Sequence, residues 1–168
     1  MDAPTFRREP ARPDDLPAIV EIYNSTVASR MVTADLDPVT VDSRRAWFDA
    51  HGAANRPLWI VRDGPGIAGW LSFSDFYGRP AYRHTAEVSV YLREDWRGRR
   101  LGRWLLRESI AHAPSIEVAT LLGFVFGHNA PSLGLFRSEG FEAWGTYPRV
   151  AVLDGVERDL VVLGRRVA

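Results

Sequence analysis

AEVSVYLREDWRGRRLG, residues 86–102, is the stretch of this chain that says most about its fold. Its first part alternates between apolar and polar side chains, which predicts a β-strand. The apolar face consists of Ala86, Val88, Val90 and Leu92. Glu87 lies on the other face, where an unpaired carboxylate loses solvation and its pKa rises, the condition that a general base near neutral pH requires. The alternative is a structural acid that pairs with Arg83 or His84.

The second part of the stretch is an Arg/Gly loop that leads into a helix. The loop consists of Arg97, Gly98, Arg99, Arg100, Leu101 and Gly102. A helix N-terminus presents unpaired N–H groups and the positive end of the helix dipole, so it binds anions. Gly98 and Gly102 allow a ligand to approach the backbone closely, and the arginines supply charge. The loop is therefore predicted to bind an anion, with a basic surface turn as the alternative.

A later segment, GHNAPSLGLFRSEGF at residues 127–141, follows the strongly apolar stretch 121–126. Asn129 followed by Ala-Pro-Ser is typical of a helix start, and Gly140 with the aromatic after it is typical of a helix end. The acid-bearing strand, the Arg/Gly loop and this segment together resemble the GNAT-type N-acetyltransferase family. His128 lies next to Asn129 at the strand end and is a candidate for a pH-dependent role, with a solvated loop histidine as the alternative.

The resemblance implies acetyl-CoA as co-substrate. It implies that the loop 97–102 holds the pyrophosphate and that the backbone of Val90, Tyr91 and Leu92 pairs with the pantetheine arm. Asn129 and Ser132 would lie beside the arm. Glu87 would take the proton of the acceptor amine, through a bridging water, before direct attack on the thioester.

Three stretches resemble more closely the acetyltransferases that act on phosphinothricin or methionine sulfoximine. They are residues 23–27, 69–75 and 82–92. This likeness implies a small amino-acid-like amine as acceptor, with Arg30 and Arg83 as candidates to bind its anionic group and Phe73 as a candidate wall of the acceptor site. Each has a simpler interpretation, an exposed loop arginine or a core aromatic. The likeness also implies a homodimer.

Three positions depart from the family pattern. Arg100 stands where the family loop has a glycine, so the loop differs there or the arginine points away from the diphosphate. A third alternative is that Arg100 contacts a phosphate of CoA. Phe136 stands where many relatives have a tyrosine that protonates the departing thiolate. Arg158 stands where the phosphinothricin enzymes have a histidine.

Composition excludes several classes of protein. The 168 residues fit one domain, expected to span 1–168, and 21 basic against 21 acidic residues argue against a nucleic-acid partner. The absence of cysteine excludes disulfides, zinc-thiolate sites and a cysteine nucleophile. No metal site is apparent. No apolar run is long enough to span a membrane and no signal peptide is evident, so we expect a soluble cytoplasmic protein.

The periodicity predicts an α+β fold with a mixed, mostly antiparallel central sheet flanked by helices, the order that the family resemblance also implies. The predicted strands are 5–10, 58–62, 67–74, the Glu87 strand, a strand ending at 126, 141–150 and 157–165. The predicted helices begin near 14, span 40–51 and 101–113, and follow Asn129.

Two other functions remain open at this point. One is acetylation of a protein N-terminus or lysine, which the likeness to small-acceptor enzymes disfavours. The other is a regulatory module that binds CoA without turnover. Phe136 and Arg100 support the regulatory module, and Glu87 argues against it.

Overall fold

A computed structural model describes residues 5–168, which contain seven strands and four α-helices. The strands are β1 (Arg8–Pro10), β2 (Leu58–Asp63), β3 (Gly66–Asp75), β4 (Thr85–Leu92), β5 (Thr120–Phe126), β6 (Glu142–Leu153) and β7 (Val156–Arg166). The helices are α1 (Leu16–Asn24), α2 (Arg45–Asp49), α3 (Leu101–His112) and α4 (Ala130–Ser138).

All seven strands form one sheet in the order β1-β2-β3-β4-β5-β7-β6. Every neighbouring pair is antiparallel except β4 and β5, which are parallel because α3 connects them across the sheet. The predicted α+β architecture with a mixed, mostly antiparallel sheet is confirmed.

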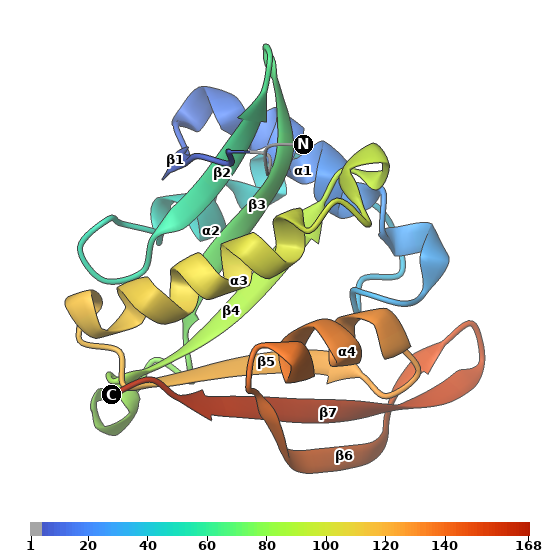
Figure 1. Cartoon of the computed structure of the whole chain (residues 1–168). Helices are drawn as coiled ribbons and strands as arrows, with labels where there is room; N and C mark the ends of the chain where they lie inside the picture. The colour runs from blue at the N-terminus through green and yellow to red at the C-terminus, as the bar shows by residue number, and fades with distance from the viewer. Residues whose placement is uncertain (1–4) are drawn as a thin grey trace.

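The helices cover the two faces of the sheet (Figure 1). On one face α3 packs on β3 and β4 over a core that includes Leu71, Val88 and Leu105, each at most 2% exposed. On the other face α1 and α2 cover a second core around Ile60 and Trp70. The alternation along β4 therefore separates two environments, because Val88 faces α3 while Glu87 faces the α1 side.

β4 and β5 are paired over only part of their length. The register joins Thr85–Glu87 to Thr120–Leu122, and no residue of β5 pairs with β4 beyond Glu87. Figure 1 shows the two strands side by side at one end and diverging toward the other, where the loop before α3 and the helix α4 lie. This gap opens the centre of an otherwise continuous sheet.

The boundaries of the N-terminal elements differ from those predicted. The helix expected over 40–51 is an α-helix only at Arg45–Asp49, preceded by a 3₁₀ turn at Asp42–Arg44. Ser43 donates its backbone N–H to the hydroxyl of Thr40. This side-chain contact satisfies the N–H group in place of a helical backbone hydrogen bond, so the regular α-helix begins later than predicted. The first strand, expected over 5–10, is paired only from Arg8.

A buried acid holds the two helices beside the gap together. Glu139 follows α4, its side chain is 6% exposed, and it forms ion pairs with Arg103 and Arg107 of α3. Burial opposes the charged carboxylate, but the hydrogen bonds from the two arginines outweigh it and hold the pKa of Glu139 below its ordinary value. The separation of α3 and α4 is thereby set by a charged contact.

No helix within residues 5–168 is long and apolar enough to cross a bilayer.

Candidate active site

Three adjoining cavities lead through the gap between β4 and β5. A groove of about 380 Å³, here called the cofactor groove, lies along the loop before α3. A narrow space of about 50 Å³, here called the waist, lies between the diverging strands, and a cavity of about 180 Å³ beyond it contains Glu87. Tyr91 lines all three, and Ser89 is common to the waist and the Glu87 cavity. The path therefore passes from one face of the sheet to the other.

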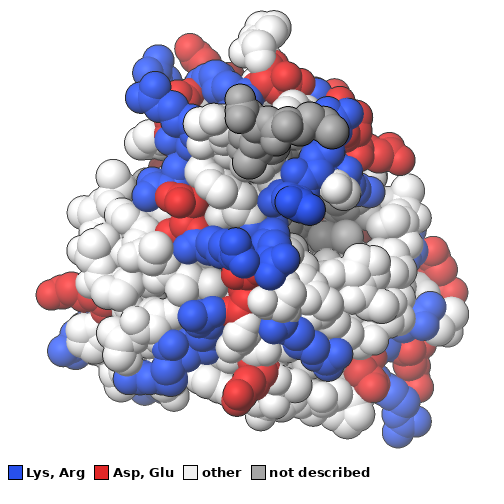
Figure 2. Space-filling view, viewed as in Figure 1, with Lys and Arg blue, Asp and Glu red and all other residues white. Residues whose placement is uncertain are grey.

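The cofactor groove combines a helix N-terminus with basic side chains. Its lining consists of Thr26, Val32, Val90, Tyr91, Leu92, Arg97, Gly98, Arg100, Leu101, Gly102, Arg103, Pro131, Ser132 and Leu135. Figure 2 shows arginine side chains gathered on the face that α3 and α4 form, with acidic side chains among them. The twelve-residue helix α3 begins in this groove, so its dipole and its unpaired N–H groups face the same space.

Arg100 takes the backbone conformation for which the family pattern places a glycine. Its φ is 67°, in the left-handed region, and it occupies the N-cap position of α3. The loop therefore keeps its turn despite the substitution, at a cost of about 1–2 kcal/mol for a residue that carries a Cβ. The side chain also lines the groove, which is compatible with the alternative in which Arg100 contacts a phosphate of CoA.

Two arginines of this region differ from the prediction. Arg99 does not line the groove, because its guanidinium carbon lies 5.1 Å from the centre of the Trp96 ring. Arg103, one turn into α3, does line it and was not predicted. Arg103 lies three residues after Arg100, and residues three or four apart lie on the same face of a helix, so both reach the groove.

The waist is bounded by β4, β5 and α4. Asn129 caps α4, since its Oδ1 accepts the N–H of Ser132 at 3.2 Å, and both residues line the waist. The predicted capping role of Asn129 is thus confirmed. Phe136 closes the far side, and its ring lies against Gly123, where an added Cβ would come within 2.4 Å of a ring carbon. A close approach of this kind requires a glycine.

Glu87 lies half-buried in its cavity without a charged partner. Within residues 5–168 its carboxylate makes no ion pair or hydrogen bond, and burial raises its pKa above the ordinary value. The structural alternative, a pair with Arg83 or His84, is not formed. His84 contacts the carbonyl of Glu117 through Nδ1 at 2.6 Å, and Arg83 lies in an exposed turn. Glu87 therefore has the raised pKa predicted from the sequence.

The predicted acceptor residues lie outside the Glu87 cavity. Arg30 forms an ion pair with Asp154 at 2.9 Å and donates to the carbonyl of Leu36. Arg83 lines a separate surface cavity at the other end of β4. Phe73 is fully buried against Trp59 on the α3 face, because it pairs with Val88 and shares the orientation of that residue. Phe73 as an acceptor wall is wrong.

The Glu87 cavity is also lined by Ser89 and by Tyr91, whose backbone was predicted to hold the cofactor arm. The lining further includes residues that the sequence did not single out: Ile19, Val20, Tyr23, Val39, Arg44, Trp47, Trp70, Ser72 and Ser74. Tyr91 stacks on Trp70 with ring centres 4.5 Å apart. The alternation of side chains along β3 could have identified Ser72 and Ser74, because they pair with Ser89 and Glu87 of β4 and lie on the same face of the sheet.

The segment 30–41 is fastened to the end of β5. His128 contacts the carbonyl of Arg30 through Nε2 at 2.8 Å, and the side-chain amide of Asn129 donates to the carbonyl of Met31 at 2.9 Å. Val32 thereby comes to line both the waist and the cofactor groove. His128, expected as a solvated histidine, is half-buried and serves this contact.

The waist joins a basic groove to a cavity that contains the half-buried Glu87, and this arrangement suits the transfer of a group from an anionic carrier to an amine. In agreement with this, residues 18–141 match the Acetyltransferase (GNAT) family. The chain belongs to this family and is an acetyltransferase.

The similarity to individual proteins covers most of the chain. The Bacillus subtilis protein YwnH, whose assignment as a phosphinothricin acetyltransferase is itself provisional, is 51% identical over 92% of this chain and 94% of its own. A methionine sulfoximine/methionine sulfone acetyltransferase of Pseudomonas paraeruginosa is 35% identical over 89% and 87%. The structure of yncA from Salmonella typhimurium, solved with its cofactor acetyl-CoA, superimposes with a TM-score of 0.90 at 29% identity, covering 98% and 95%.

Proposed function

We propose that residues 1–168 form a single domain that transfers the acetyl group of acetyl-CoA to the primary amine of a small amino-acid-like acceptor, of the phosphinothricin or methionine sulfoximine type. The observation that carries the proposal is the continuous path from the cofactor groove through the waist to Glu87. Acetyl-CoA supplies an activated acyl thioester. The chain would bind it in the cofactor groove and the acceptor in the Glu87 cavity, so that the two reactants meet at the waist.

The residues of the cofactor groove fit an anionic carrier. The start of α3 and the side chains of Arg97 and Arg100 suit a diphosphate, because N–H groups and guanidinium groups point into one groove. Val90, Tyr91 and Leu92 lie on the part of β4 that β5 leaves unpaired, so their backbone suits the amide groups of the pantetheine arm. Asn129 and Ser132 border the same space.

Glu87 is the general base of the proposed reaction. An amine with a pKa near 10 is protonated at neutral pH and must lose that proton before it attacks. A desolvated carboxylate with a raised pKa accepts a proton more readily than an exposed one, directly or through one water. The absence of cysteine excludes a cysteine acyl-enzyme and so supports direct transfer in a ternary complex. Phe136 supplies no proton, so the departing thiolate receives none from that position.

The size of the Glu87 cavity supports a small acceptor. A cavity of about 180 Å³ whose lining includes tryptophan and tyrosine rings suits a single amino acid better than a protein surface. The chain also resembles an enzyme that acts on methionine sulfoximine and methionine sulfone, over nearly its whole length.

An acceptor screen tests this proposal. With acetyl-CoA, we expect methionine sulfoximine or phosphinothricin to be acetylated at least about tenfold faster than a peptide amine, because only the small acceptors fit beside Glu87. Release of free thiol provides the readout, and the enzyme adds no thiol background because it contains no cysteine.

The control for the screen is the reaction without acceptor, which measures hydrolysis of acetyl-CoA. The chain contains no lysine, so mass spectrometry of the enzyme can detect acetylation of its own amine only at the N-terminus. Acetylation of a peptide amine with no reaction of either small compound would replace the proposal by protein acetylation. Binding of acetyl-CoA without turnover of any amine would support the regulatory module instead.

A homodimer is part of the proposal. β6 lies at the edge of the sheet, and residues 142–150 of that strand are exposed. The exposed apolar side chains of β6 include Trp144 at 49%, Val150 at 58% and Val152 at 56%. An exposed strand edge that carries large apolar side chains is suited to pairing with a second copy.

Light scattering is expected to give the mass of two chains. The double substitution Val150→Asp and Val152→Asp places charges on this edge, so we expect it to yield a monomer of unchanged secondary structure. The control is Val156→Asp, which changes another exposed valine, at 47%, just beyond the β6–β7 turn. A monomeric wild-type protein would contradict the proposed assembly.

A further inference from the structure

Arg44 is the only basic side chain that lines the Glu87 cavity in the part of the chain that the structure describes. We infer that Arg44, held in place by Asp35 and Tyr23, binds the α-carboxylate of the acceptor and so selects amino acids over simple amines. The inference rests on the proposed function, because it names the group that recognises the acceptor in that same cavity.

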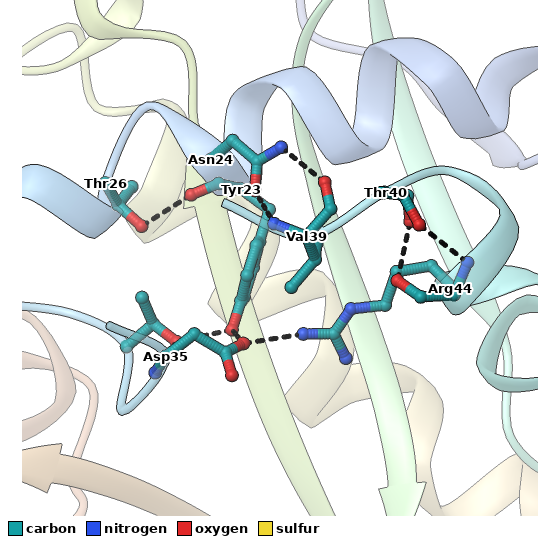
Figure 3. A network of polar contacts seen from close by, with 9 residues as sticks. Tyr23, Asn24, Thr26, Asp35, Val39, Thr40 and Arg44 are labelled. Atoms are coloured by element: carbon teal, nitrogen blue, oxygen red, sulfur yellow. Dashed lines mark hydrogen bonds and ion pairs between the residues drawn. The ribbon is translucent and has the colours of Figure 1, made fainter. Parts of the chain in front are cut away.

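The guanidinium of Arg44 is held from two directions (Figure 3). Its Nη2 lies 2.8 Å from Oδ2 of Asp35, and its central carbon lies 4.7 Å from the centre of the Tyr23 ring. Tyr23 in turn donates its hydroxyl to Asp35 and contacts the hydroxyl of Thr33. A planar guanidinium fixed by an acid and by a ring face has lost most of its rotamer freedom before a ligand arrives.

The same guanidinium keeps unused binding capacity. Arginine has five N–H donors, and across residues 5–168 the only side-chain acceptor that Arg44 contacts is Asp35. The side chain is 28% exposed and reaches a cavity whose only carboxylate is Glu87. The remaining donors can therefore pair with a carboxylate that enters the cavity, a charge-assisted contact of the stronger kind.

The charges of the cavity complement those of an amino acid. A zwitterion carries its ammonium and its carboxylate on one carbon atom, so a site that binds it needs an acidic and a basic group bordering one small space. Glu87 and Arg44 both border this cavity, and the rest of its lining is uncharged. An amine without a carboxylate would leave Arg44 without its second partner in a partly desolvated place.

A purely structural role for Arg44, fastening the segment 30–41, is the competing explanation. That segment has other attachments. Asn24 donates to the carbonyl of Val39 at 2.9 Å and accepts the N–H of Val39 at 2.8 Å, and Figure 3 shows both contacts. Asn129 and His128 hold the opposite end. Loss of Arg44 should therefore leave the segment in place.

The test compares methionine sulfoximine with its carboxamide, which keeps the amine and loses the negative charge. We expect the wild type to prefer the acid by at least about tenfold in kcat/KM. In Arg44→Gln this preference should disappear, with KM for the acid raised roughly tenfold to a hundredfold and kcat changed much less. Arg44→Lys keeps the charge without the planar fork, so it should retain part of the preference.

Arg45→Gln is the matched control, because Arg45 is the adjacent residue, is 62% exposed and pairs only with Asp42 within the region described. It should behave as the wild type. A thermal unfolding temperature and an acetyl-CoA affinity unchanged in Arg44→Gln would exclude a merely structural effect. Retention of the wild-type preference for the acid in Arg44→Gln would overturn the inference.

Failure of the proposed function would give a different result from failure of the Arg44 inference, because the wild type itself would then acetylate neither methionine sulfoximine nor its carboxamide. Loss of acetyl-CoA affinity in Arg44→Gln, with the secondary structure intact, would instead assign Arg44 to holding the segment beside the cofactor groove and would also overturn the inference.

Discussion

Replacing Glu87 with Gln is expected to lower kcat by about a hundredfold or more while leaving the affinity for acetyl-CoA nearly unchanged. The substitution keeps the shape of the side chain and removes its basicity. Glu87 lies beyond the waist, away from the groove that is proposed to hold the cofactor, so binding and turnover should separate. Steady-state kinetics with an amine acceptor and calorimetry with acetyl-CoA measure the two effects.

The pH dependence of the reaction provides an independent check. Burial raises the pKa of Glu87, and only the deprotonated carboxylate can act as a base. The wild-type kcat/KM should therefore fall as the pH is lowered through this raised pKa, and the residual activity of Glu87→Gln should lack that decrease. Glu142→Gln, an exposed acid at the start of β6, is the matched control. Near-normal turnover of Glu87→Gln would assign the base elsewhere, with His128 as the next residue to test.

Gly102→Asp is expected to weaken acetyl-CoA binding by at least about a hundredfold. Gly102 is buried in the first turn of α3 and lines the cofactor groove. An added Cβ would meet a methyl carbon of Leu92 at 3.3 Å and one of Leu135 at 3.4 Å, so the carboxylate beyond it has little room except toward the groove. A negative charge there repels a diphosphate. Calorimetry measures the loss.

Two further variants separate binding from folding. Gly134→Asp makes the same change on the exposed side of α4, where no atom lies within 4 Å of an added Cβ, so it should bind acetyl-CoA normally. If Gly102→Asp does not fold, the pair Arg97→Gln and Arg100→Gln removes exposed charges instead and should weaken binding roughly tenfold. Unchanged affinity in a folded Gly102→Asp protein would reject this loop as the cofactor site.

Local sequence pattern predicted most of the elements but not the gap at their centre. The alternation of β4 and the helical repeat of α3 depend on residues close in sequence, so both could be predicted. The divergence of β4 from β5 after Glu87 depends on how α3 and α4 pack, which residues close in sequence do not encode. The Arg100 loop shows the same limit, because the surrounding fold imposes a left-handed backbone that arginine does not itself prefer.

The candidate site divides in the same way. Glu87 was recognisable because an acid interrupts an apolar strand, whereas Arg44 ends a polar 3₁₀ turn before α2 and has arginine as its neighbour, so no such contrast marks it. Arg30, Arg44 and Arg83 have the same side chain, and the sequence does not show which of them reaches the acceptor. Only the tertiary structure shows that Arg30 pairs with Asp154 and that Arg44 lines the cavity. For Phe73 the simpler interpretation, a core aromatic on the apolar face of its strand, is the correct one, and its pairing with Val88 shows which face of the sheet that is.

Under the proposed binding mode, the gap between β4 and β5 would also make the stability of this protein depend on metabolism. A ligand that paired with the backbone of β4 left free by β5 would act as a missing strand, and it could do so only in the folded chain. Ligand at a hundred times its Kd stabilises a folded protein by about 2.7 kcal/mol, a large fraction of the total for a domain of this size. The lifetime of the protein against unfolding and proteolysis would then follow the supply of acetyl-CoA, so that the enzyme is most durable when its acetyl donor is abundant.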